Sequence, residues 1–172
     1  MKIFWQDCKR KGNLFLKKNT DRRVKVFLDS NVILSGLLSE KSYPRIILDL
    51  CCLNLRGIQF LTGEYNLLEI ERNLEKKLPQ ALKVYEKYLP FLNLRIVPLP
   101  DKKTVMKWSK IITPKDAPVI ASAGKSNADI LVTEDKKDFA PLRSAKTCPF
   151  EILSPSEFVN KKIKDILISE HF

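Results

Sequence analysis

Histidine is nearly missing from this chain of 172 residues: the only one, His171, lies close to the end of the sequence. This scarcity argues against Ser-His-Asp and Cys-His catalysis, against histidine zinc sites, and against nucleases that use a histidine acid and base. A hydrolase with this sequence would therefore draw its catalytic groups from carboxylates, lysine, serine or threonine, with or without a metal ion.

Long apolar runs are also missing. The most apolar stretch, residues 46–55, is interrupted by Asp49 and Asn54, so the sequence contains no candidate membrane span. The sequence does not open with the long apolar segment of a signal peptide. We therefore expect an intracellular, cytoplasmic protein with no membrane partner.

The four cysteines show no C-x-x-C spacing, which argues against a zinc site. Cys51 and Cys52 are adjacent in an apolar, helix-like run, so we expect buried free thiols there. Free thiols of this kind suit a reducing cytosol.

The formal net charge of +11 is unevenly distributed. Residues 1–25 carry nine Lys and Arg against two Asp, and the remaining 147 residues carry 22 against 18. A basic balance favours nucleic-acid partners electrostatically, although a solvated tail would look the same. We expect residues 1–23 to be a basic N-terminal extension and residues 24–172 to be one folded domain with a real core.

The stretch that organises the chain is residues 24–38, V-K-V-F-L-D-S-N-V-I-L-S-G-L-L. Its apolar start is typical of a buried parallel strand, and its apolar end recurs at helical spacing. Asp29 stands where the strand should end, and Asn31 is the expected helix N-cap. A carboxylate at that point lies in the crevice where open α/β sheets bind ligands. The alternative is that Asp29 only stabilises the turn.

Strand-like and helix-like segments alternate along the rest of the chain. Further strands are predicted at 58–61, 94–97, 129–132 and 150–153, and helices at about 44–53, 63–78, 79–92, 101–112 and 117–123, with another after residue 154. This alternation implies right-handed βαβ units. We therefore predict a three-layer α/β/α fold of the Rossmann-like kind, with a central parallel sheet of four to five strands.

Acidic residues also follow the strand predicted at 129–132. Asp135 comes shortly after it, and Asp138 follows three residues later. Because parallel strands end at the same edge of a sheet, Asp29 and Asp135 should face one crevice. Ordinary turn chemistry would explain Asp135 as well, and a surface charge would explain Asp138.

Two further carboxylates occur on predicted helices. Asp116 directly precedes A-P-V-I-A-S-A, where it would serve as an N-cap or a first-turn charge. Capping still leaves one carboxylate oxygen for a metal ion. Glu69 falls nearly opposite the apolar stripe of Leu67, Ile70 and Leu74, so helical periodicity alone predicts a solvated side chain.

Taken in order, these stretches resemble the PIN domain family. The similar segments are V-F-L-D-S-N-V-I-L-S-G-L-L, P-R-I-I-L-D-L, L-T-G-E-Y-N-L-L-E-I-E-R-N-L, K-D-A-P-V-I-A-S-A and A-D-I-L-V-T-E-D-K-K-D-F. They extend over roughly residues 24–155 in the family's order and spacing. The resemblance is strongest to the toxin components of prokaryotic type II toxin–antitoxin pairs.

The resemblance assigns roles residue by residue. It implies four catalytic and metal-holding carboxylates: Asp29, Glu69, Asp116 and Asp135. It implies three supporting residues: Asn31, Thr133 and Asp138. One residue departs from the pattern, because Glu134 stands where a glycine is usual, and an extra carboxylate there would crowd the loop or alter metal affinity.

Several carboxylates cannot all ionise in one pocket without a countercharge, and oxygen ligands favour Mg²⁺ or Mn²⁺ over zinc. The resemblance implies a metal-dependent endoribonuclease that hydrolyses single-stranded RNA, with an antitoxin and a second copy of the chain as candidate partners. The alternative is a PIN-fold module, impaired in catalysis, that binds RNA or protein. Two other functions fit the sequence less well. A haloacid-dehalogenase-like phosphotransferase needs a second Asp at the position of Asn31, and a receiver domain does not account for the four carboxylate motifs.

Overall fold

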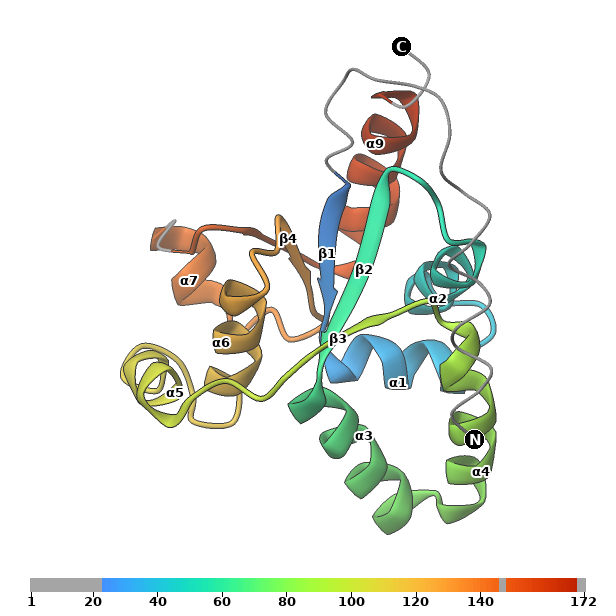
Figure 1. The fold of residues 1–172 in the computed structure, drawn as a ribbon, viewed down its shortest axis with the longest axis horizontal. Coiled ribbons are helices and arrows are strands. Elements are labelled where there is room, and N and C mark those ends of the chain that lie inside the picture. The colour runs from blue at the N-terminus through green and yellow to red at the C-terminus, as the bar shows by residue number, and fades with distance from the viewer. Residues whose placement is uncertain (1–22, 146–147, 170–172) are drawn as a thin grey trace, which may run out of the picture.

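The computed structural model describes residues 23–145 and 148–169. The predicted basic extension therefore lies outside the described residues except for Arg23, and His171 and Cys8 also lie outside them. Five parallel strands form the central sheet in the order β3-β2-β1-β4-β5 (Figure 1). They are β1 Val24–Leu28, β2 Ile58–Gly63, β3 Arg95–Val97, β4 Ile130–Val132 and β5 Glu151–Leu153. The predicted parallel sheet is confirmed.

Strand β1 is the centre of the sheet and divides the core in two. Val26 pairs with Phe60 of β2 and with Ile130 of β4. The side chains of Val26 and Leu28 belong to the core on one face, and Phe27 belongs to the core on the other. All three are fully buried, which explains why residues 26–28 form an unbroken apolar run.

Helices cover both faces, which confirms the three-layer α/β/α prediction (Figure 1). One face carries α1 Ser30–Leu38, α2 Tyr43–Leu53, α3 Glu64–Lys77, α4 Pro79–Tyr88, the 3₁₀ turn η2 Leu89–Phe91, and the terminal α8 Pro155–Glu157, η3 Phe158–Lys162 and α9 Ile163–Ser169. The other face carries α5 Lys102–Trp108, α6 Ala117–Lys125 and α7 Ala140–Ala145. Within the described ranges, no helix is long and apolar enough to cross a membrane.

The first helix begins one residue earlier than predicted, and the expected N-cap was wrong. Asp29 is the N-cap of α1, and its carboxylate accepts a hydrogen bond from the Ser30 backbone N–H at 2.7 Å. Asn31 lies inside the first turn, where its amide bonds to the segment that follows β4. The carboxylate that ends β1 therefore also starts α1.

Other elements also differ from the prediction, and the helix predicted at about 79–92 is divided into α4 and the turn η2. Helix α5 ends at Trp108 rather than Ile112. The chain tightens there, with the Ile111 N–H bonded to the Trp108 carbonyl three residues back, and it soon reaches Pro114, which disfavours helix in the residue before it. Helix α7 was not predicted, because residues 140–145 are too few to show a helical period. None of these changes moves the strand ends that carry the acidic residues.

Candidate metal centre

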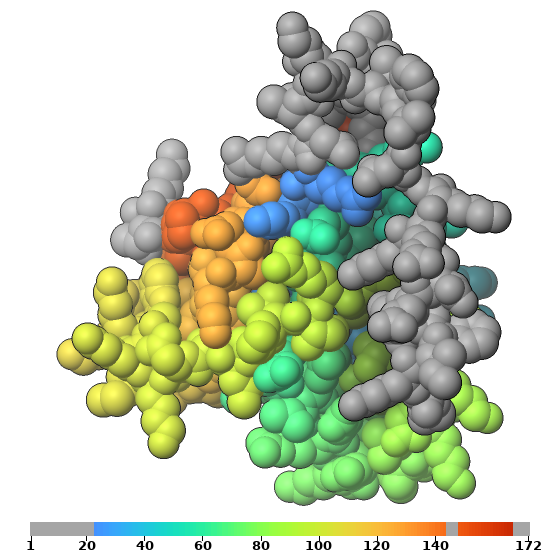
Figure 2. Space-filling view, in the orientation of Figure 1, coloured from blue at the N-terminus to red at the C-terminus, as the bar shows by residue number. Residues whose placement is uncertain are grey.

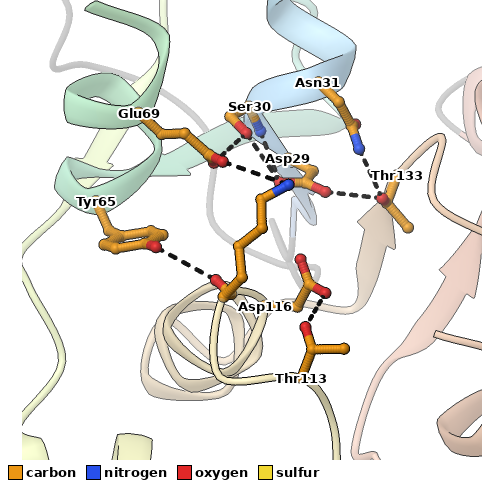
Figure 3. A network of polar contacts seen from close by, with 9 residues as sticks. Asp29, Ser30, Asn31, Tyr65, Glu69, Thr113, Asp116 and Thr133 are labelled. Carbon is orange, nitrogen blue, oxygen red and sulfur yellow. Dashed lines mark hydrogen bonds and ion pairs between the residues drawn. The ribbon is translucent and has the colours of Figure 1, made fainter. Parts of the chain in front are cut away.

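The four carboxylates named from the sequence line one small pocket of about 100 Å³ at the carboxyl ends of the strands. Figure 3 shows Asp29, Glu69 and Asp116 with their polar contacts. Asp29 ends β1, Glu69 lies on α3, Asp116 directly precedes α6, and Asp135 follows β4. Other residues complete the lining: Ser30, Asn31, Leu34, Ile70, Asn73 and Lys115. The fold thus gathers, at one edge of the sheet, acidic groups that are up to 106 residues apart.

Asp29 lies at the floor of the pocket with only 4% of its surface exposed. One carboxylate oxygen accepts from the Ser30 N–H, and the other accepts from the Thr133 hydroxyl at 2.7 Å. Burial raises the pKa of Asp29 from 3.8 to about 6, although these two hydrogen bonds lower it. The charges of Glu69 and Asp116 raise it further. Asp29 is therefore an ionisable group held in a site that penalises its charge.

Thr133 links the ends of β1 and β4 through a fully used hydroxyl group. It donates to Asp29 and accepts from the Asn31 side-chain amide at 3.3 Å and from the Asp135 backbone N–H at 3.1 Å. One hydrogen and two lone pairs are thereby satisfied. The Asn31 side-chain oxygen accepts from the Glu134 N–H, which fixes the loop after β4 against α1. The hydroxyl and the amide hold this loop in place beside the acidic pocket.

Glu69 faces the pocket and not the solvent that periodicity predicted. Its side chain is 20% exposed and accepts a hydrogen bond from the Ser30 hydroxyl at 2.6 Å. The Lys115 ammonium lies 3.7 Å from its other oxygen. The interpretation from periodicity alone was wrong because the start of α1 packs against this side of α3.

Asp116 stands at the N-cap position of α6, but its side chain makes no capping hydrogen bond. It accepts instead from the hydroxyl of Thr113. One carboxylate oxygen from each of Asp116, Asp135 and Asp138 lies within 4.8 Å of the other two. The Asp135 charge, above all, raises the pKa of Asp138. Asp116 thus makes no capping bond, although its charge still lies at the N-terminus of α6.

Lys115 is the cation that lines the pocket. Burial lowers its pKa, but Glu69, Asp116 and the other pocket carboxylates outweigh this and raise it. The lysine is exposed, so solvent screens its charge. One ammonium faces four carboxylates, so the pocket needs further positive charge or bound protons.

Three polar residues of the lining were not expected from the sequence: Ser30, Asn73 and Lys115. Asn73 follows Glu69 by four residues, a spacing that places both on one side of α3. Ser30 and Lys115 are direct neighbours of the predicted ligands Asp29 and Asp116. These positions could have been inferred from spacing and adjacency, but their contacts depend on segments distant in sequence.

Comparison with protein-family models matches residues 25–137 to the PIN domain. The chain belongs to the PIN domain family. The match includes more than half of the sequence and all four pocket carboxylates. A search of curated proteins found no match.

Solved structures share the PIN fold at low sequence identity. VapBC2 from Rickettsia felis, bound to a DNA fragment from its promoter, is 18% identical with a TM-score of 0.55, covering 76% of this chain and 98% of that one. DNA-bound VapBC from Salmonella typhimurium is 18% identical with a TM-score of 0.54, covering 77% and 98%. PAE2754 from Pyrobaculum aerophilum is 13% identical with a TM-score of 0.58, covering 87% and 99%.

Glu134, which stands where a glycine is usual in the PIN pattern, does not enter the pocket. Its exposed carboxylate accepts a hydrogen bond from the Ser35 hydroxyl on α1. The residue is absent from the pocket lining. The extra carboxylate is therefore directed away from the four acidic side chains.

Proposed function

We propose that this PIN domain is a metal-dependent endoribonuclease that hydrolyses phosphodiester bonds in single-stranded RNA. The observation that carries the proposal is the convergence of Asp29, Glu69, Asp116 and Asp135 on one pocket. These carboxylates come from separate parts of the sequence, and the capping alternative for Asp116 is not used. Such a gathering of acidic groups is costly to a fold unless a ligand neutralises it.

The donor set fits a hard divalent cation. Asp116, Asp135 and Asp138 offer carboxylate oxygens close enough to share one ion, and Asp29 and Glu69 lie in the adjoining part of the pocket. All these ligand atoms are oxygens, which suits Mg²⁺ or Mn²⁺ better than zinc. When bound, such a cation would activate water for attack on a phosphodiester and neutralise the charge that develops.

The chain's own residues prepare the pocket for this chemistry. Thr133 and the Ser30 N–H orient the Asp29 carboxylate, and the Ser30 hydroxyl orients Glu69. Asn31 and Thr133 hold the loop that carries Asp135. Lys115 supplies a positive charge at the exposed mouth, where it can contact the RNA phosphate.

We further propose that the protein is the toxin component of a type II toxin–antitoxin pair and acts in the cytoplasm. The ordered motifs of the sequence and the fold shared with VapBC structures support this assignment. A cognate antitoxin and a second copy of the chain are the proposed protein partners. The second candidate, an impaired PIN-fold module that binds RNA or protein, drew its support from Glu134, whose carboxylate lies outside the pocket.

Cleavage of a labelled, unstructured RNA oligonucleotide tests the proposal. Wild type should cleave it with Mg²⁺ or Mn²⁺ and not in chelator. Asp135→Asn should abolish cleavage, whereas Asp165→Asn, an exposed residue on α9 outside the pocket, should cleave like wild type. Cleavage that persists in chelator or in the Asp135 variant would refute the proposal. Metal binding without cleavage of RNA would favour the binding module.

A further inference from the structure

The described part of the chain carries an unusual basic segment beside the acidic pocket. Residues 102–115 contain five lysines and no acidic residue. Four of them, together with Thr104 and Met106, line an open hollow of about 700 Å³ along α5: Lys102, Lys103, Lys107 and Lys110. We call these four residues the α5 lysine face.

The α5 lysine face has one acidic neighbour in sequence, Asp101, whose carboxylate caps α5. Lys103 and Lys107 are four residues apart on α5, so their like charges are stacked along one side, and Lys110 follows the end of the helix. Lys102 and Lys103 lie in the first turn, where the helix dipole disfavours a cation. None of the ion pairs found among the described residues involves this face. The like charges along α5 repel one another, and an external anion would relieve this repulsion.

The remaining side of α5 accounts for its place in the fold. Val105 and Trp108 pack against the core on the Phe27 side of the sheet, whereas the lysines and Met106 are exposed. Figure 2 shows this yellow segment projecting at the edge of the molecule, next to the orange α6. A core role therefore explains the apolar positions of α5 and leaves its lysines unexplained.

The α5 lysine face leads toward the acidic pocket. The chain passes from Lys110 through a turn to Lys115, which lines the pocket beside Asp116. Helix α5 lies against α6, whose first residue follows Asp116 (Figure 1). The basic segment that begins on α5 therefore ends at the acidic pocket.

We infer that the α5 lysine face binds the phosphate backbone of the single-stranded RNA substrate and, with Lys115, guides it into the pocket. The choice of RNA as ligand rests on the proposed function. The face itself rests on charge complementarity: a row of solvated lysines suits a flexible polyanion. These lysines are positioning residues for the RNA and take no part in bond cleavage.

Salt-dependent RNA binding tests the inference. The full-length protein is titrated with a fluorescent, unstructured RNA oligonucleotide in chelator, and anisotropy is measured over a range of KCl concentrations. Loss of two phosphate contacts in Lys103→Gln/Lys107→Gln should reduce the slope of log affinity against log salt by about 1.4. The matched control, Lys161→Gln/Lys164→Gln, removes two exposed lysines from η3 and α9 and should keep the wild-type slope.

Failure of this inference is distinguishable from failure of the proposed function. Equal slopes for both double variants would overturn the inference, even if metal-dependent cleavage is confirmed. A slope that changes with duplex DNA but not with RNA would also overturn it and reassign the face to DNA. In cleavage assays, the α5 variant should raise KM several-fold with little change in kcat, unlike a pocket variant. If the α5 double variant has the reduced slope but the wild-type protein cleaves no RNA, the inference stands and only the nuclease function is refuted.

Discussion

Replacing Asp29 with asparagine should stabilise the metal-free protein at neutral pH. The folded-state pKa of Asp29, about 6, exceeds its ordinary value of 3.8 because the carboxyl is buried. A raised carboxyl pKa makes stability greatest below pH 3.8 and diminishes it as pH rises through about 6. Asparagine has nearly the same size and carries no charge, so it removes this pH-dependent penalty.

The magnitude follows from the same values. A rise in pKa from 3.8 to about 6 corresponds to about 3 kcal/mol of penalty when the group is fully ionised. Asparagine keeps one acceptor oxygen, so it loses the bond from either the Ser30 N–H or the Thr133 hydroxyl, at about 1 kcal/mol or somewhat more. The net gain in unfolding free energy should be about 1–2 kcal/mol, with a Tm increase of about 2–4 °C for each kcal/mol.

Urea unfolding in chelator at about pH 7.5 and about pH 4 measures this effect. Asp29→Asn should be more stable than wild type at the higher pH and equal or slightly less stable at the lower pH. The control Asp165→Asn, on the surface of α9, should match wild type at both. A variant that is destabilised equally at both pH values would mean that Asp29 serves only the turn and the helix cap, and would refute the reasoning.

Three further predictions concern the loop after β4 and the basic extension. Thr133→Val removes the hydroxyl that joins Asp29, Asn31 and Asp135, so the free energy of unfolding measured in urea should fall by about 1–3 kcal/mol. An unchanged free energy of unfolding would contradict the role given to this hydroxyl. Glu134→Gly should leave the Mn²⁺ affinity measured by calorimetry unchanged, because the Glu134 carboxylate accepts from the Ser35 hydroxyl outside the pocket. A marked rise in affinity would show that Glu134 does disturb the site. Deleting residues 1–23 should flatten the salt dependence of RNA binding while circular dichroism shows the fold intact, and an unchanged slope would exclude contact with phosphates.

The sheet could be predicted because its signals are local. An apolar run that ends at Asp29 identifies a buried strand and the position of its carboxyl end, and parallel strands share that edge by necessity. The placement of Asp135 after β4 follows from the same rule. Strand ends are therefore the part of the candidate site that sequence reasoning reaches most directly.

The rest depends on contacts between distant segments. Periodicity places Glu69 opposite an apolar stripe, but Ser30, 39 residues away, determines that this side of α3 faces a pocket. Asn31 and Asp29 both have side chains suited to an N-cap. The Asn31 side-chain oxygen, the atom that would cap, accepts instead from the N–H of Glu134, 103 residues away, and Asp29 caps α1. Local propensity cannot choose between such options, because the deciding hydrogen bonds form only after the sheet has assembled.

Calorimetric titration of Mn²⁺ into chelator-treated protein, with RNA cleavage followed on the same samples, tests the central claim most directly. Wild type should bind Mn²⁺ and acquire cleavage activity over the same concentration range. Asp116→Asn/Asp135→Asn removes two of the three carboxylates that lie within reach of one ion, so it should lose both binding and cleavage while remaining folded. Cleavage without bound metal, or full metal binding and cleavage in this double variant, would contradict the assignment of the pocket as a metal centre.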